Sequence, residues 1–255
     1  MSLKSFRLFV VFVLAAIVMF TAMFVSASDM DNRIESSIKQ SYVFKTYLKD
    51  DSISVNSKNG VVTLVGTVRE DSHKSLAKET AEDTPGVKKV NNQLVYKGEL
   101  PAENSDGWII MKVKTALMFH PSVSVIATGV DAKDGVVTLR GEASSQAQKE
   151  LAGQYALDVE GVKDVKNNMT LAANPAHVPE TLGDKIDDAS ITAFVKLALL
   201  THRSTSMIKT KVRTTNGVVT LHGQAKNDAE KALVGKLASD IKGVTSVVNN
   251  MTVQK

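Results

Sequence analysis

The octapeptide NGVVTLVG at residues 59–66 decides the fold of this 255-residue chain, because the chain contains two further copies of it. DGVVTLRG stands at residues 134–141 and NGVVTLHG at residues 216–223. In each copy another glycine follows 26 residues after the first one, at Gly86, Gly161 and Gly243. Offsets of 75 and then 82 residues superimpose the copies without a gap. Self-similarity at a fixed spacing indicates homologous units in tandem, so we predict three domains.

Each unit is predicted to contain, in order, a helix, two strands, a second helix and a third strand. Apolar residues at helical spacing mark the first helix, and a short strand follows around Val55, Val130 or Val212. The Asn-Gly or Asp-Gly pair then makes a tight hairpin turn, since such pairs tolerate positive φ angles. The buried stripe of the first helix is predicted to comprise Ile34, Ile38, Ser41 and Tyr42, then Ile109, Val113, Ala116 and Leu117, then Ile191, Val195, Ala198 and Leu199.

The second half of each unit completes a small α+β domain. We expect the second strand to end at Gly66, Gly141 and Gly223. The second helix is expected to stop at the later glycine, where a left-handed cap is favourable. Its predicted buried residues are Leu76, Leu151 and Leu233, followed by Ala81, Ala156 and Ala238. A strand, a helix and a further strand favour a right-handed crossover. We predict three tandem αββαβ domains at residues 29–98, 103–173 and 183–255, each a three-stranded mixed sheet with two helices on one face.

Residues 1–27 differ from the repeats. Lys4 and Arg7 precede an uncharged apolar run of 18 residues from Leu8 to Val25, and small residues follow directly. This order is typical of a secretory signal peptide, although the run also meets the lower limit for a membrane span. We favour a cleaved signal peptide over an uncleaved anchor in the inner membrane. In both cases we expect the repeats to lie in the periplasm.

Cysteine content and charge narrow the function classes. The chain has no cysteine, so it gains no disulfides and cannot carry a lipid on an N-terminal cysteine. Basic and acidic residues number 11 and 10 at residues 29–98, 7 and 10 at residues 99–173, and 11 and 7 at residues 174–255. The C-terminal unit alone therefore favours an anionic partner, and only mildly.

These units resemble the bacterial osmotically inducible and nodulation domain, the BON domain. The resemblance covers nearly all of residues 29–255 and rests on three motifs. They are the xGVVTLxG hairpin, the ending GV-x-x-V-x-N-N at residues 161–168 and 243–250, altered at 86–92, and DGWI at residues 106–109. The resemblance implies an αββαβ fold, an envelope location, a role under osmotic or related stress, and binding to phospholipid membranes or other envelope components. It implies no catalytic residues.

Residues that occur in one copy only are the better candidates for a binding site, because the shared fold explains the shared residues. Trp108, Met111 and Met118 lie on one line of a predicted helix, flanked by Lys112 and Lys114. The equivalent positions in the other two units include Arg33 and Ser190. A core position rarely accepts arginine or serine, so we predict that this line faces outward. Exposed Trp and Met beside lysine suit a membrane interface or a partner protein; packing of Trp108 against a neighbouring unit is the alternative. The equivalent positions are Arg33, Ser36 and Val43 in the first unit and Ser190, Ala193 and Leu200 in the third.

A second candidate is cationic. Lys209, Lys211 and Arg213 alternate along the predicted strand before the third hairpin, so their side chains share one face. Such a row suits anionic lipid headgroups, where each charge contributes up to about 1 kcal/mol. The alternative, which we favour at this point, is a solvated edge that discourages strand pairing.

The remaining polar residues indicate no catalytic, metal or cofactor site. His120 and His202 occupy equivalent places in separate units, so we expect them to lie at helix ends and far apart. The other histidines lack ligand residues at metal-binding spacing, and no phosphate loop or nucleophile motif occurs. These other histidines are His73, His177 and His222. We therefore predict a protein that is not an enzyme and needs no metal or cofactor.

The predicted function combines these observations. We expect a periplasmic protein whose three domains together bind anionic phospholipid surfaces and support envelope integrity, since tethered weak binders gain effective concentration. The alternative is an adaptor or chaperone-like module for envelope proteins, with Trp108 in the contact. Nucleic acid is not an expected partner, and the sequence does not constrain the oligomeric state.

Overall fold

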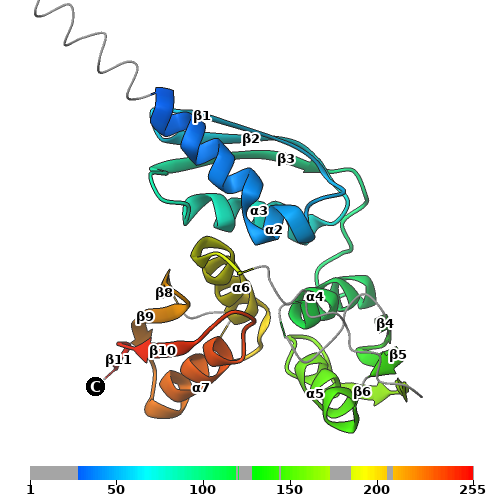
Figure 1. The fold of residues 1–255 in the computed structure, drawn as a ribbon. Helices are drawn as coiled ribbons and strands as arrows, with labels where there is room; N and C mark the ends of the chain where they lie inside the picture. Colours follow the sequence, from blue (N-terminus) through cyan, green and yellow to red (C-terminus); the bar gives the residue numbers. More distant parts are fainter. Residues whose placement is uncertain are drawn as a thin grey trace, which may run out of the picture.

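The computed structural model describes residues 28–118, 120, 128–143, 145–172, 185–205 and 209–254. The signal-like segment at residues 1–27 lies outside this part of the chain. Figure 1 shows three lobes, one for each repeat, gathered around helix α6 (Asp188–Thr201). Within the described ranges, every helix is too short or too polar to cross a membrane.

The first domain has the predicted order of elements. It contains a helix over residues 28–40, α2 (Tyr42–Thr46), β1 (Ser52–Lys58), β2 (Val61–Val68), α3 (Asp71–Glu82) and β3 (Lys89–Tyr96). Strand β2 pairs antiparallel with β1 and parallel with β3, which makes the predicted mixed sheet. Val62 and Leu64 are buried under the helices, whereas Val65 is exposed on the opposite face. The helices therefore cover one face of the sheet.

The second and third domains repeat this plan. The second contains α4 (Asp106–Met118), β4 (Thr128–Lys133), β5 (Val136–Ala143), α5 (Gln146–Leu157), β6 (Asp164–Asn167) and β7 (Thr170–Leu171). The third contains α6, β8 (Thr210–Thr215), β9 (Val218–Ala225), α7 (Asp228–Ser239), β10 (Ser246–Asn249) and β11 (Thr252–Val253). In both domains the third strand is split into two short segments that pair parallel with the middle strand. The three tandem αββαβ domains are thus confirmed.

The predicted ends of the second strand and second helix were wrong. Strands β2, β5 and β9 continue two residues beyond their glycines. Gly66 lies inside β2 with a φ of 138°, and a Cβ there would stand 1.8 Å from the Ser52 carbonyl oxygen. Glycine is needed there because the backbone of β1 crosses too closely for a side chain. The second helices end before Gly86, Gly161 and Gly243, which lie at positive φ in the following turn.

In the second helix of the middle domain, Ala156 is buried as predicted, but the prediction for Leu151 was wrong. Leu151 is 37% exposed, and the buried residues of α5 are Ala152 and Ala156. These two alanines are one helical turn apart, so they define the face that packs on the sheet. In the first domain Leu76 is buried as predicted, and in the third Leu233 packs against the core at its margin.

Two side-chain contacts recur in all three domains and explain the repeated motifs. An aspartate in the first helix accepts hydrogen bonds from both backbone amides of the hairpin turn. An asparagine in the third strand donates to a backbone carbonyl of the second helix and accepts from the amide two residues later. The aspartates are Asp31, Asp106 and Asp188, and the asparagines are Asn92, Asn167 and Asn249.

The described residues form two hydrophobic cores, although there are three domains. Domains 1 and 3 share one continuous core, and domain 2 has a core of its own. Helix α6 lies at the centre and contacts both α3 and α4 (Figure 1). Its buried residues surround the whole helix, whereas a helix at the surface of one small domain buries a single stripe. The arrangement depends on contacts between the repeats.

Candidate functional site

The strongest candidate surface is the cationic row, which consists of Lys209, Lys211 and Arg213. All three side chains are exposed, while the intervening Val212 and Thr214 are buried. The predicted period of two along this segment is confirmed, because alternate residues of a strand point to opposite faces. The row therefore lies on the face of the third sheet that the helices leave open.

The described strands around the row contain no acidic residue. Lys211 is opposite His222 on β9, and Arg213 is opposite Thr220. Strands β8, β9, β10 and β11 contain no aspartate or glutamate. Within the described residues, none of the three cations has a carboxylate within ion-pair distance. The open face of domain 3 thus carries three unpaired cations.

The other two domains lack this row. The equivalent strand positions in domain 1 are the neutral Ser52, Ser54 and Asn56, which are exposed on the same face. In domain 2 the equivalents of Lys211 and Arg213 are Gly129 and Asp131, and Asp131 forms an ion pair with Arg140. A contact needed for folding would recur in every copy. The row is therefore specific to the third domain.

Arg213 also lies at the edge of a cleft of about 840 Å³ between domains 1 and 3. Its nearest carboxylates already have partners. Asp187 caps α6 and accepts a hydrogen bond from the Tyr42 amide, Asp188 binds the hairpin amides, and Asp83 pairs with Lys196. Burial raises the pKa of Asp83, and the Lys196 ammonium only partly opposes that effect. Among the described residues Arg213 forms no ion pair with these carboxylates, although Glu82, Asp83, Asp187 and Asp188 make the lining of the cleft acidic.

The line of Trp108, Met111 and Met118 does not form one open surface. Trp108 is half-buried at the start of α4 and packs against the core of its own domain. Lys112 Nζ lies 3.9 Å from the centroid of the Trp108 ring and 2.8 Å from Glu160 Oε2. Met118 packs instead against the core that domains 1 and 3 share. Met111 is half-buried and Lys114 is exposed.

The prediction that this line faces outward was wrong for three of the six equivalent positions in the other domains, whereas Arg33 and Ser36 are exposed as predicted. Val43, Ser190 and Ala193 are completely buried, and the Val43 amide donates to Ser190 Oγ across the interface between domains 1 and 3. Serine is accepted at this buried position because its hydroxyl is hydrogen-bonded. Leu200 remains exposed. In domains 1 and 3 this helix face is used for contacts between domains.

The prediction that His120 and His202 lie far apart was also wrong. Both follow first helices, as expected, but the two rings are close enough to interact electrostatically across the contact between domains 2 and 3. The described residues contain no group of three or more potential metal ligands. His73 pairs with Asp51 Oδ2 at 2.6 Å inside domain 1, and His177 lies outside the described residues.

Sequence reasoning missed an aromatic cluster between domains 1 and 3. Phe194 on α6 makes edge-to-face contacts with Tyr42 and Tyr47, with ring centroids 6.3 and 5.5 Å apart. The positions equivalent to Phe194 are Ser37 and Lys112. A large apolar residue where the other copies are polar was the available signal that α6 has an additional partner.

These features define a class: a tandem array of small αββαβ modules, the third of which presents a cationic surface. The family model of the BON domain matches residues 30–98, 105–173 and 187–255. The chain therefore belongs to the BON domain family, as the motifs indicated.

Three relatives are similar to this chain. It is 34% identical over 147 residues to Osmotically-inducible protein Y of Escherichia coli, covering 57% of this chain and 71% of that protein. It is 27% identical over 144 residues to an Uncharacterized protein in gshII 5'region of Anaplasma centrale, covering 56% and 91%. It is 25% identical over 138 residues to the Outer membrane lipoprotein DolP of Haemophilus influenzae, covering 53% and 69%.

Proposed function

We propose that this protein is a non-enzymatic component of the bacterial envelope that binds anionic phospholipid surfaces through the cationic row of domain 3. The carrying observation is that Lys209, Lys211 and Arg213 are exposed together on a face without carboxylates. Unpaired cations attract anionic headgroups without first giving up an internal ion pair. The row is therefore the surface of this chain best suited to such a contact.

The spacing of the row fits a surface of many anions better than a single small ligand. Alternate residues of a strand are about 7 Å apart, so the three charges extend over about 14 Å. At up to about 1 kcal/mol for each charge, the row contributes at most about 3 kcal/mol. Binding by the row alone is thus weak and sensitive to salt. Exposed Lys114 and the partly exposed Trp108 on domain 2 supply further weak contacts.

The names of two relatives support an envelope location and a role under osmotic stress. One is named as osmotically inducible and another as an outer membrane lipoprotein. The signal-like residues 1–27 agree with export. The chain has no cysteine, so a lipid on an N-terminal cysteine is not its route to the membrane. We infer a periplasmic protein that contacts the membrane surface reversibly and supports the envelope under osmotic or related stress.

Flotation with lipid vesicles tests the proposal. We expect the protein to float with vesicles containing phosphatidylglycerol and not with pure phosphatidylcholine, and high salt should release it. The variant with Lys209→Gln, Lys211→Gln and Arg213→Gln should bind more weakly by up to about 150-fold, since the row contributes up to about 3 kcal/mol.

The matched control carries Lys49→Gln, Lys89→Gln and Lys97→Gln, three exposed cations of domain 1. Its net charge changes by the same amount, so it should keep most of the binding. Equal losses in both variants would show that only net charge matters. Failure of the unmodified protein to bind anionic vesicles would disprove the proposal outright.

A further inference from the structure

Domains 2 and 3 meet through equivalent parts of their folds. His120 follows α4 and His202 follows α6, and the two residues are 82 positions apart, as the repeat requires. His202 forms a β-bridge with Val159 at the end of the second helix of domain 2, and its Nε2 lies 3.9 Å from Asp158 Oδ2. In return, the backbone of Asp240, the equivalent of Asp158, hydrogen-bonds the His120 ring. We call this contact the histidine seam.

His120 is the most enclosed group of the histidine seam. It is 6% exposed, and its ring stacks on Tyr155 with centroids 3.5 Å apart and an angle of 8° between the planes. Its Nδ1 has no hydrogen-bond partner among the described residues. A neutral imidazole tolerates this position, because an unpaired acceptor costs far less than an unpaired charge. A protonated ring would bury a positive charge without a carboxylate bound to it.

Among the described residues, no carboxylate is paired with the His120 ring. Helix α5 presents Tyr155 and Asp158, the segment after α6 presents His202 and Arg203, and the end of α7 presents Asp240. The Asp158 side chain faces His202, and its backbone carbonyl accepts the Arg203 amide. Asp240 meets His120 through its backbone. His202, when protonated, adds repulsion.

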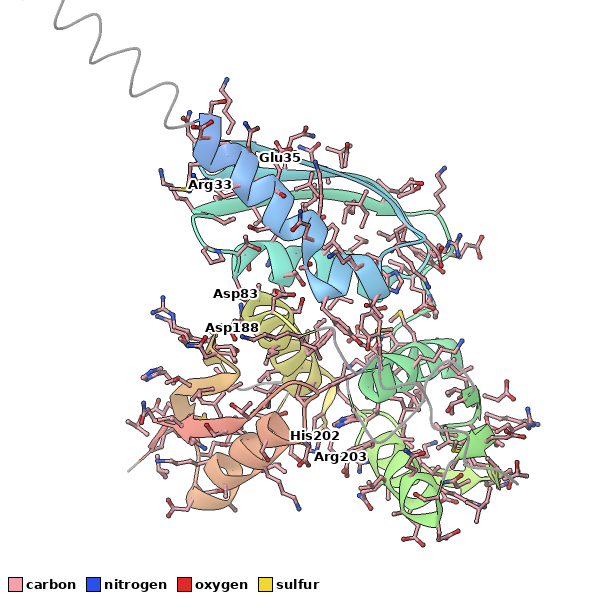
Figure 2. The ribbon with its side chains drawn as sticks, in the orientation of Figure 1. Arg33, Glu35, Asp83, Asp188, His202 and Arg203 are labelled. Atoms are coloured by element: carbon pink, nitrogen blue, oxygen red, sulfur yellow. The ribbon has the colours of Figure 1, made fainter. Side chains whose placement is uncertain are left out.

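Domain 2 is the domain that can separate. Its core is independent, whereas domains 1 and 3 share theirs. Figure 2 shows His202 and Arg203 between domains 3 and 2, at the end of α6 opposite to Asp83 of domain 1. Outside the seam, domain 2 is held by contacts such as the Met118 carbonyl, which accepts a hydrogen bond from the Tyr47 hydroxyl. Release of domain 2 would keep the fully buried residues of each core together and would withdraw Met118 from its place against the shared core.

We propose that acidification releases domain 2 from the unit formed by domains 1 and 3, and that protonation of His120 is the trigger. The proposal is independent of phospholipid binding, because it concerns only the contact between the domains.

The pH range follows from the His120 imidazole. Burial lowers its pKa from 6.5 to about 4 in the docked protein. Above pH 6.5 the ring is neutral whether domain 2 is docked or released. Between pH 6.5 and about 4 the released ring takes up a proton and the docked ring does not, so docking weakens as the pH falls. At pH 5 the docking equilibrium constant should be about 20-fold lower than at pH 7.

Distance measurements between domains test the proposal. The chain has no cysteine, so dyes can be placed selectively at Ala147→Cys on α5 and Ala229→Cys on α7, two exposed and equivalent positions. We expect energy transfer between the dyes to fall as the pH is lowered from 7.5 to 5. A second pair, Asn56→Cys with Ala229→Cys, reports on domains 1 and 3 and should not change.

The variants identify the trigger. His120→Phe keeps a flat ring on Tyr155 and cannot be protonated, so it should stay docked at pH 5. His222→Phe removes an exposed histidine of domain 3 and should respond like the unmodified protein. An unchanged distance in the unmodified protein, or the same acid response in His120→Phe, would overturn the proposal.

A direct titration of His120 by nuclear magnetic resonance does not depend on how the variants fold. Its midpoint in the docked protein should lie well below 6.5. A midpoint near 6.5 would contradict the proposal.

Discussion

Single residues explain why the hairpin motif is repeated so closely. The glycine two residues after the Thr-Leu pair lies inside a strand, where its backbone meets the neighbouring strand. The aspartate of the first helix accepts hydrogen bonds from both amides of the turn that precedes this strand. Both residues act on backbone geometry, which all three domains share.

Gly66→Ala should destabilise the protein by about 1–3 kcal/mol, because a φ of 138° is strained for alanine and the Cβ would overlap the Ser52 carbonyl. Denaturation with urea measures the loss. Gly129→Ala is the matched control: it also lies in a strand, and its nearest neighbour atom would be 3.8 Å away. Similar losses in both variants would contradict the role given to Gly66.

Asp106→Asn should lower the thermal stability of domain 2 at pH 7. The hydrogen bonds from Gly135 and Asp134 lower the pKa of Asp106. Its stabilisation is therefore present above the unfolded value of about 3.9 and is lost as the pH falls through the lower folded pKa. The difference in Tm between variant and parent should accordingly disappear at strongly acidic pH. Circular dichroism at pH 7 and below pH 3 measures it, with Asp164→Asn as an exposed control expected to show no difference.

Among the elements, the third strand and helix α6 hold the assembly together. The third strand is bound to the second helix by one asparagine side chain in each domain. Helix α6 belongs to domain 3, yet its Lys196 pairs with Glu79 of α3 in domain 1 and with Asp83, which directly follows α3. The same α+β unit therefore gains different neighbours depending on its position in the chain.

Asn249→Ala should cost about 1–3 kcal/mol, because the Lys231 carbonyl and the Met251 amide would lose their partner. Asn250→Ala, at the next position, should have little effect, since the Asn250 side chain is exposed and its backbone amide makes the contact with Leu221. Chemical denaturation of the two variants compares neighbouring asparagines directly. A larger effect at Asn250 would exclude this assignment.

At the scale of the whole molecule, the shared core predicts how the protein unfolds. Domains 1 and 3 should unfold together as one cooperative unit, and domain 2 should unfold in a transition of its own. Differential scanning calorimetry should resolve two transitions, the larger one belonging to the joint unit. Three transitions of similar size would indicate independent domains.

Core substitutions assign the transitions. Phe194→Ala removes the ring that packs against Tyr42 and Tyr47, and should destabilise the larger transition by about 3–5 kcal/mol. Val137→Ala, in the separate core of domain 2, should lower the other transition. An effect of Phe194→Ala on domain 2 alone would refute the shared core.

The amino-acid sequence by itself determined the repeated αββαβ unit, the hairpins and the cationic row, because these depend on local periodicity and turn chemistry. Val212 and Thr214 alternate with the cations whatever the domain packs against. Only the tertiary structure decided that Phe194 and Val43 are buried between domains and that His120 and His202 meet. It also decided that Met118 and Trp108 pack against different cores. Those outcomes depend on which surfaces of the three similar domains pack together. The packing is decided by shape and burial among residues far apart in the sequence, so local periodicity does not predict it.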